Sequence, residues 1–371
     1  MGCGRARGKV GNKCATRPTL PYLTLAGSLV TMWLLNLTIM GDQLLPIPRV
    51  PDGLREAAQL GKLIPFVGAG ASRLAGCPSW PQFADDALKW LIQNGKFTYS
   101  QLDQIRSLHP RLKLSLARTL AKEKGIVIDF RSLLHPTLRR DHKNGCKLYN
   151  SLFSLGKIFV TTNYDEWLDE RIPEPTPAVN PSMVPTNRSA INPMHVVYRV
   201  ADLIPSLLSE PNTVIHLHGS LLDPAGMILT THDYVQHYAN DRLTVGSGQE
   251  NRVLTFLQNL FSNKTVLFIG YGLEELEILE YVILKRQPFG SPGGEARHYI
   301  LQGFFSHEET LLQSLKSYYL NECGIQLIPF LRDEKDWEQL IDVLEEFARS
   351  IPASDPLVLH KKQEMEEWLN G

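Results

Sequence analysis

Three short segments of this chain carry groups that suit a nucleotide site. Residues 66–72 read F-V-G-A-G-A-S, residues 161–165 read T-T-N-Y-D, and residues 216–219 read H-L-H-G. Each segment lies at the end of a short apolar run that is typical of a buried strand. In an open α/β sheet, ligands bind at the edge formed by the carboxyl ends of the strands. The three segments together therefore predict one site at that edge.

The first segment contains a glycine-rich turn made of Gly68, Ala69, Gly70, Ala71 and Ser72. Because glycine has no β-carbon, the backbone can approach a diphosphate closely and point successive N–H groups at its oxygens, and the Ser72 hydroxyl can add a donor. The segment has neither the G-x-G-x-x-G spacing nor the lysine of a phosphate-binding P-loop. A plain strand-to-helix turn is therefore the alternative interpretation.

The second segment supplies Asn163 and Asp165. The Asn163 amide has donors and an acceptor, so it can hold a ribose hydroxyl and a water molecule together, and the Asp165 carboxylate can accept from an amide. Both residue types are also preferred helix caps, and a helix is expected around Trp167 and Leu168. Helix capping is therefore the alternative role for this segment.

The third segment places His216 and His218 two residues apart, so a strand would present both imidazoles on one face. No third ligand lies at a usual metal spacing, so no metal site is predicted. His218 directly precedes Gly219, where the chain is expected to leave the sheet, and a neutral histidine there can act as a general base. The alternative is a structural histidine, which is the role we assign to His216.

A fourth segment, Gly270-Tyr271-Gly272, follows the strongest predicted strand, residues 265–269. Its two glycines offer the same freedom of close backbone approach as those of the first segment. The segment predicts a second contact with a nucleotide, on the adenosine side, or a second plain strand-to-helix turn.

The elements that must position these segments alternate along the chain. Strands alternating with helices predict an α/β fold, here a Rossmann-like, mostly parallel sheet with helices on both faces. Apolar runs predict strands at residues 63–68, 157–162, 214–217, 227–230, 265–269, 298–301 and 325–330. Apolar residues at three- and four-residue steps predict helices at residues 54–61, 80–91, 252–261, 273–284, 337–348 and 361–369, and another around Val235.

Two segments interrupt this alternation. Residues 95–155 are predicted to form a helical insertion. Residues 173–194 hold six prolines and are predicted as a lid-like loop, because long loops in compact domains often bind or cover ligands. The predicted domains are an amino-terminal extension at 1–40, one catalytic domain at 41–352, and a carboxyl-terminal helix or tail at 353–371.

The extension at residues 1–40 departs from an ordinary soluble start. Five basic residues precede an uncharged stretch at 18–41, whose mostly apolar centre runs through residues 23–40. This pattern is typical of a signal peptide or a single membrane anchor. Synthesis that starts at Met32 or Met40 is the alternative. We predict a cytoplasmic protein, with anchoring through residues 20–40 as the alternative.

Composition and charge narrow the class of protein. The chain has 371 residues, of which 43% are hydrophobic and 21% charged, which is the profile of a soluble globular protein. Its formal net charge of -1 provides no general attraction for nucleic acid or acidic membranes, so no direct nucleic-acid binding is predicted. The five cysteines form no C-x-x-C pair, which disfavours a zinc ribbon or a disulfide framework and suits a reducing cytosol.

In this order, the four segments resemble the sirtuin-like family, and more specifically its stand-alone bacterial branch that acts in antiviral defence. The resemblance covers about residues 54–330. It equates residues 68–72 with the NAD-binding turn of the family and the turn at Gly270 with its adenosine-side glycine turn. Asn163 and Asp165 match its Asn-x-Asp motif, and His218 matches its catalytic histidine.

The resemblance implies that the protein binds NAD as its substrate and cleaves it to nicotinamide and ADP-ribose, which depletes NAD during infection. Deacylase sirtuins carry a four-cysteine zinc module that this sequence lacks, which favours NAD hydrolysis over protein deacylation. A deacylase without zinc, or a non-catalytic subunit that binds NAD or ADP-ribose, is the alternative. Relatives of similar size imply self-association or a separate partner, either a HerA-type ATPase or a short Argonaute protein.

Overall fold

The computed structural model describes residues 44–172, 194–238, 251–272 and 298–351 of the chain, together with Ile278, Met365 and Trp368. The described residues all belong to one compact unit, which spans Leu44–Gly371. The predicted extension at 1–40, the predicted loop at 173–194 except Met194, and most of the predicted helix at 273–284 and of the predicted tail lie outside them. Within the described ranges, no helix is long and apolar enough to cross a membrane.

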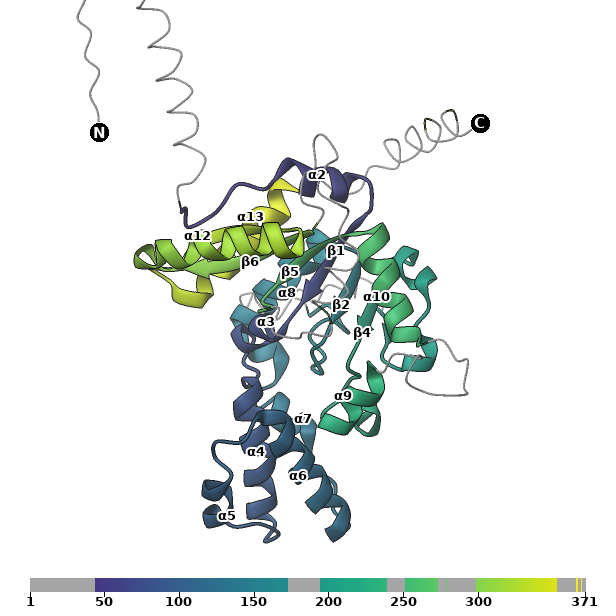
Figure 1. Cartoon of the computed structure of the whole chain (residues 1–371), viewed down its shortest axis with the longest axis vertical. Helices are drawn as coiled ribbons and strands as arrows, with labels where there is room; N and C mark the ends of the chain where they lie inside the picture. The colour runs from purple at the N-terminus through teal and green to yellow at the C-terminus, as the bar shows by residue number, and fades with distance from the viewer. Residues whose placement is uncertain are drawn as a thin grey trace, which may run out of the picture. The chain divides into compact units, whose positions relative to one another are not determined.

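Among the described residues, seven strands form one parallel sheet in the order β3-β4-β2-β1-β5-β6-β7 (Figure 1). This arrangement confirms the predicted α/β, Rossmann-like fold. The strands are β1 (Leu63–Val67), β2 (Ile158–Thr161), β3 (His195–Val197), β4 (Thr213–His216), β5 (Thr265–Ile269), β6 (His298–Phe304) and β7 (Ile325–Leu331).

Both faces of the sheet are covered, which explains why its central strands are apolar along their whole length. In β1, Leu63 and Val67 join one hydrophobic cluster, whereas Ile64 and Phe66 join another on the opposite face. Helices α2 (Asp52–Gln59), α8 (Lys143–Leu155) and α13 (Gln339–Ser350) contribute to the first cluster, and α10 (Arg252–Asn263) and α12 (Glu309–Tyr318) contribute to the second.

A helical module with its own apolar cluster adjoins the sheet. Helices α4 (Trp80–Gln93), α5 (Tyr99–Gln104), α6 (Pro110–Lys124) and α7 (Phe130–Leu134) lie together at the bottom of Figure 1, with α9 (Thr231–His237) beside them. Inside it, the nearly buried Lys113 ammonium of α6 pairs with the Asp85 carboxylate of α4 at 2.7 Å. The predicted insertion at 95–155 is helical, but the module begins earlier, with α4, and α8 packs on the sheet.

The structure differs from the predicted elements at residues 227–230, where no strand forms. The Leu229 and Thr230 N–H groups donate to the Asp233 carboxylate in a capping arrangement at the start of α9, so they are not available to a strand partner. Helix α3 (Ala69–Leu74), helix α12 and the edge strand β3 were not predicted. Short turns of 3-10 helix lie at Arg139–Asp141, Val200–Asp202, Pro205–Ser209, Pro224–Gly226, Ser306–Glu308 and Asp336–Glu338, and a π-helical turn lies at Tyr319–Cys323.

Candidate functional site

The four segments singled out in the sequence leave the sheet at one level. Val67 of β1 is paired with Thr161 of β2 and with Ile269 of β5, and Thr161 is paired in turn with His216 of β4. Each of these four residues is the last of its strand. The glycine-rich turn, the Asn-x-Asp segment, the histidine segment and the second glycine turn therefore begin at the same height on four adjacent strands.

Strand β1 lies where the strand order reverses. From β1 the chain passes to β2 on one side, and it later returns from β4 to β5 on the other side of β1. In open parallel sheets, such a reversal forms a crevice outside the carboxyl ends of the strands, and ligands bind there. The fold thus brings the four segments to the edge of the sheet that is best suited to a ligand.

The two glycine turns pack against each other. The Gly68 N–H donates to the Ile269 carbonyl (2.9 Å), and the Gly70 N–H donates to the Gly270 carbonyl (2.7 Å). A β-carbon on Gly68 or Gly70 would lie 2.7 or 2.8 Å from the Gly270 oxygen, so the approach of the two backbones itself requires glycine. These two N–H groups, which we predicted to face a diphosphate, point at β5 and its exit turn instead.

A buried polar cluster follows the glycine-rich turn. The Ser72 hydroxyl donates to Asp165 Oδ2 (2.6 Å), accepts from Asn163 Nδ2 (2.7 Å) and lies 3.2 Å from the Tyr149 hydroxyl of α8. Burial, and then the charge of Asp165, raises the pKa of Tyr149 well above its usual value, so this hydroxyl stays protonated. The structure therefore brings Ser72, Asn163 and Asp165 together and adds Tyr149, which no sequence motif marks.

The Asn-x-Asp segment after β2 is fixed by a hydrogen bond within the segment and by two arginines from the helical region before β2. Asp165 Oδ1 accepts from the Trp167 N–H (3.1 Å), so this carboxylate also fixes the local turn, although turns replace the helix predicted there. The neighbouring Glu166 carboxylate pairs with Arg131 of α7 at 2.5 Å, and Arg139 donates to the Glu166 carbonyl. The helical region before β2 therefore positions the Asn-x-Asp segment.

His216 supports this segment from β4. Its Nδ1 lies 2.8 Å from the Asn163 carbonyl oxygen and its Nε2 lies 2.7 Å from Asp169 Oδ1. Burial opposes protonation of His216, but the charge of Asp169 and the two hydrogen bonds outweigh it and raise the pKa above its ordinary value. His216 therefore anchors the backbone of Asn163, in keeping with the structural role that we assigned to it.

The His216–Asp169 pair predicts a pH-dependent effect of Asp169→Asn. Because the folded-state pKa of His216 is raised above the unfolded value near 6.5, the extra stability is present below that pH and is lost as pH rises through the folded pKa. We expect Asp169→Asn to lower the free energy of unfolding more at about pH 6 than at about pH 9, measured by urea unfolding. An equal loss at both pH values would contradict a charged His216.

His218 lies in a second buried cluster. Its Nε2 is 2.7 Å from the Tyr238 hydroxyl, its Nδ1 is 3.3 Å from the Tyr234 hydroxyl, and the residue is 1% exposed. Burial, followed by the effects of His237 and Arg111, lowers the pKa of His218 well below its ordinary value. The imidazole is therefore neutral near pH 7, as a general base must be, and one hydroxyl donates to it while the other accepts.

Helix α6 of the helical module packs against α9, the helix whose tyrosine contacts His218. The Arg111 guanidinium lies 3.6 Å from the centre of the Tyr234 ring. Arg118 pairs with Asp233 of α9 at 2.7 Å and donates to the Met227 carbonyl (3.0 Å). These contacts hold α9 beside the end of β4, so the module supports the cluster that contains His218.

Tyr164 links the two clusters. It follows Asn163 in the chain, its ring centroid is 6.5 Å from that of His218, and its hydroxyl donates to the Ile228 carbonyl (2.6 Å). Among the described contacts, Asn163 bonds to Ser72 and His218 bonds to tyrosines, so the two candidate catalytic groups lie in neighbouring clusters. Tyr234 and Tyr238 were missed in the sequence, although their four-residue spacing places them on one face of a helix.

A parallel sheet with these segments at its point of reversal defines a Rossmann-like α/β protein with a candidate nucleotide site. A family model described as a SIR2-like domain matches residues 157–328, which supports the sirtuin-like family and an NAD-related function. The match includes Asn163, Asp165 and His218 and begins after the glycine-rich turn. Comparison with curated proteins finds no match. In the described part of the chain, no group of three or more His, Cys, Asp or Glu side chains is placed to hold a metal ion.

Proposed function

We propose that the protein is an NAD glycohydrolase that cleaves NAD to nicotinamide and ADP-ribose, and that it acts in anti-phage defence by depleting NAD. The observation that carries this proposal is the placement of Asn163 and His218 just beyond the carboxyl ends of adjacent strands β2 and β4, beside the glycine-rich turn after β1. The SIR2-like match over residues 157–328 supports NAD as the substrate.

Hydrolysis of the N-glycosidic bond of NAD requires few functional groups from the protein. The bond that breaks joins C1′ of a ribose to the cationic nitrogen of nicotinamide, which departs as a neutral molecule and needs no acid. As this bond breaks, its electron pair stays with nicotinamide, and water adds to C1′ through a transition state that resembles an oxocarbenium ion. The water loses one proton to a base. The protein must therefore orient the ribose, admit one water molecule and accept one proton.

The residues at the edge of the sheet supply these functions. Asn163 orients the ribose or the water, and neutral His218 accepts the proton directly or through a ribose hydroxyl. Asp165 contacts the carboxamide or organises the pocket. Ser72 is assigned to the diphosphate, and the turn at residues 270–272 to the adenosine side. The Gly68 and Gly70 N–H groups take no part in this assignment, because they donate to the Ile269 and Gly270 carbonyls. Because the Ser72 hydroxyl donates to Asp165 in this structure, a bond to diphosphate must replace that contact.

Tyr238 is expected to restrain His218, since its hydroxyl occupies Nε2 at 2.7 Å. Removing one hydrogen bond of about 1 kcal/mol should make this nitrogen available more often, so Tyr238→Phe is expected to raise nicotinamide release about fivefold. The initial rate at saturating NAD measures this change. Tyr99→Phe, at a side chain that is 66% exposed, is the matched control. A rate below that of the unaltered chain would show instead that the Tyr238 hydroxyl assists the reaction.

The role in defence is tested in cells that carry the chain and are infected with phage. We expect cellular NAD to fall after infection when the unaltered chain is present and to stay constant with His218→Ala. Protection against phage with an unchanged NAD pool would contradict depletion as the mode of action, and would favour a subunit that binds NAD or ADP-ribose without cleaving it.

The partners and the compartment are a separate part of the proposal. We propose a cytoplasmic homo-oligomer that acts alone or with a separate HerA-type ATPase or short Argonaute protein, with membrane anchoring through residues 20–40 as the alternative location. The partners rest on the family resemblance. The compartment rests on the spacing of the cysteines, and the alternative location on the apolar stretch of the amino-terminal extension.

A further inference from the structure

Tyr149 of α8 belongs to the buried polar cluster, but no step of the proposed reaction uses it. The residue is 3% exposed, and its hydroxyl lies 3.2 Å from Ser72 Oγ. Within the described part of the chain, this is the one hydrogen bond that the Tyr149 hydroxyl makes. Burying a hydroxyl costs free energy unless a partner satisfies it, so Tyr149 and Ser72 must be held opposite each other.

The ring of Tyr149 is fixed by the Asn-x-Asp segment itself. It stacks on the Trp167 indole, with ring centroids 5.1 Å apart and planes 13° from parallel. The indole also packs over Gly145, one turn earlier on α8, where a β-carbon would overlap it. Trp167 in turn donates its backbone N–H to Asp165. Tyr149 therefore bridges two parts of the site, because its ring contacts the segment after β2 and its hydroxyl contacts the turn after β1.

The direction of each hydrogen bond in this cluster follows from the number of protons. The Ser72 hydroxyl has one proton, which it donates to Asp165 Oδ2 at 2.6 Å. It must therefore accept from its two other neighbours, the Tyr149 hydroxyl and Asn163 Nδ2, and these two bonds fill its lone pairs. Because Asn163 presents Nδ2 to Ser72, its amide oxygen Oδ1 is left to accept from a ribose hydroxyl or a water molecule.

We propose that Tyr149 is a positioning residue for NAD hydrolysis, because its hydroxyl holds the Ser72 oxygen and Ser72 in turn holds the Asn163 amide in its productive orientation. The inference rests on the proposed function, in which Asn163 orients the ribose or the water. When NAD binds, Ser72 has to turn its proton from Asp165 to the diphosphate. The Ser72 oxygen still accepts from Tyr149 and Asn163 during this change, so the amide keeps its orientation.

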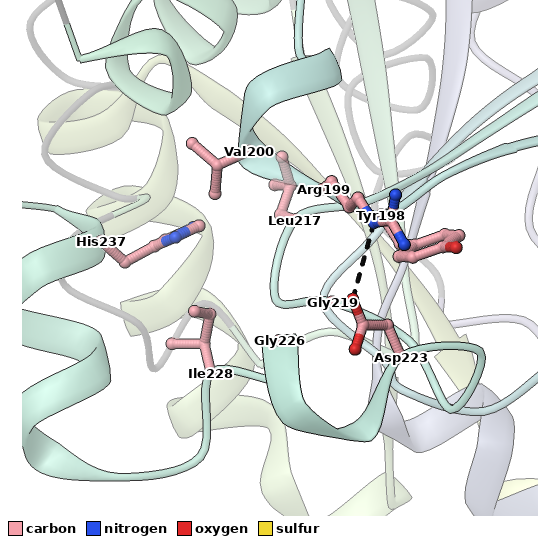
Figure 2. A pocket seen from close by; sticks show the side chains of 9 residues that line it. All are labelled: Tyr198, Arg199, Val200, Leu217, Gly219, Asp223, Gly226, Ile228 and His237. Carbon is pink, nitrogen blue, oxygen red and sulfur yellow. Dashed lines mark ion pairs between the residues drawn. The ribbon is translucent and has the colours of Figure 1, made fainter.

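We expect no water molecule to take the place of the Tyr149 hydroxyl when it is removed. The space of one hydroxyl oxygen is smaller than the roughly 30 Å³ that a water molecule occupies. A cavity of about 220 Å³ lies beside α9, and Figure 2 shows that it is lined from the histidine segment, from α9 and from residues after β3. Neither Tyr149 nor Ser72 lines this cavity, and Ser72 is 4% exposed. Ser72 therefore loses one donor without gaining another.

Tyr149→Phe removes this donor and keeps the stacked ring. We expect kcat for nicotinamide release to fall about fivefold, the effect of one ordinary hydrogen bond, with KM changed less than about twofold. Tyr319→Phe, at a buried tyrosine in the π-helical turn before β7, is the matched control and should keep the full rate. A rise in KM with an unchanged kcat would overturn the positioning role, since Tyr149 would then contribute to substrate binding alone.

The same substitution in a Ser72→Ala background tests whether Tyr149 acts through Ser72. In that background the Tyr149 hydroxyl has already lost its acceptor, so we expect Tyr149→Phe to cause no further fall in kcat. An equal fivefold fall in both backgrounds would contradict the proposal, because Tyr149 would then act without Ser72. Thermal melting verifies that each variant is folded.

A measurement without NAD separates this inference from the proposed function. The two side-chain N–H signals of Asn163, identified by their absence in Asn163→Ala, report its contact with Ser72 in a nitrogen-edited proton NMR spectrum. We expect these signals to move or broaden in Tyr149→Phe and to stay in place in Tyr319→Phe. Unchanged signals in Tyr149→Phe would rule out the positioning of Asn163, even if Ser72→Ala failed to fold. Shifted signals in a chain that leaves NAD intact would sustain the positioning and contradict only the proposed function.

Discussion

His218→Ala is expected to lower the rate of nicotinamide release from NAD by about 10²–10⁴-fold, the range typical of general-base assistance. The reason is that no other neutral imidazole is proposed to accept the proton of the attacking water. Asn163→Ala should cause a loss of similar size, because the ribose or water is then no longer oriented. Initial rates at saturating NAD, with nicotinamide quantified by chromatography, measure both changes.

The matched control for these variants is His195→Ala. His195 lies on edge strand β3 with a side chain that is 58% exposed, and it takes no part in either cluster. This variant should retain the full rate. Circular dichroism and thermal melting separate loss of chemistry from loss of fold, which matters because His218 is buried. Hydrolysis at the normal rate by folded His218→Ala and Asn163→Ala would exclude the proposed roles.

Gly270→Ala is expected to cost about 2–5 kcal/mol of unfolding free energy, the largest effect on stability that we predict. Gly270 has a φ of +61°, which disfavours any side chain, and its β-carbon would lie 2.3 Å from the Ala71 backbone nitrogen. The strain and the clash add, because neither backbone can retreat without breaking the Gly70 N–H bond to the Gly270 carbonyl. Urea unfolding measures the loss.

Gly125→Ala is the control that isolates the clash. Gly125 ends helix α6 with a nearly identical φ of +63°, and nothing lies within 4 Å of the added β-carbon. This variant should therefore cost only the conformational strain, about 1 kcal/mol. Equal losses in the two variants would show that the contact between the glycine turns is looser than the structure describes.

The sheet was predictable because its strands are buried on both faces and its ends carry small or polar residues. The apolar runs before Gly68, Asn163, His218 and Gly270 marked four strands, and the parallel register then aligned their ends. Strand β3 escaped prediction because it has three residues and an exposed edge. At residues 227–230 a strand was predicted but none forms. These residues are buried because they pack in the helical module and cap α9, not because they pair with a strand.

The contacts of the candidate site were less predictable, because they join residues far apart in the chain. Ser72 meets Asp165 across 93 positions, and His216 meets Asp169 across 47. No local spacing signals such pairs. The glycine pattern of the two turns has two possible explanations. Their pattern suits a bound diphosphate, but the close approach of the two turns already requires glycine at Gly68 and Gly70. A glycine-rich pattern therefore locates the edge of the sheet more firmly than it identifies the ligand.

The most direct test of the proposed reaction is a measurement of the products formed from NAD by the purified chain. Native mass spectrometry should record the oligomeric state of the same sample, and the reaction should be run with and without an acetyl-lysine peptide. We expect nicotinamide and ADP-ribose in equal amounts, with no dependence on the peptide. Nicotinamide release only with the peptide, accompanied by O-acetyl-ADP-ribose, would contradict hydrolysis in favour of deacylation. Tight binding of NAD that is recovered intact would contradict catalysis altogether.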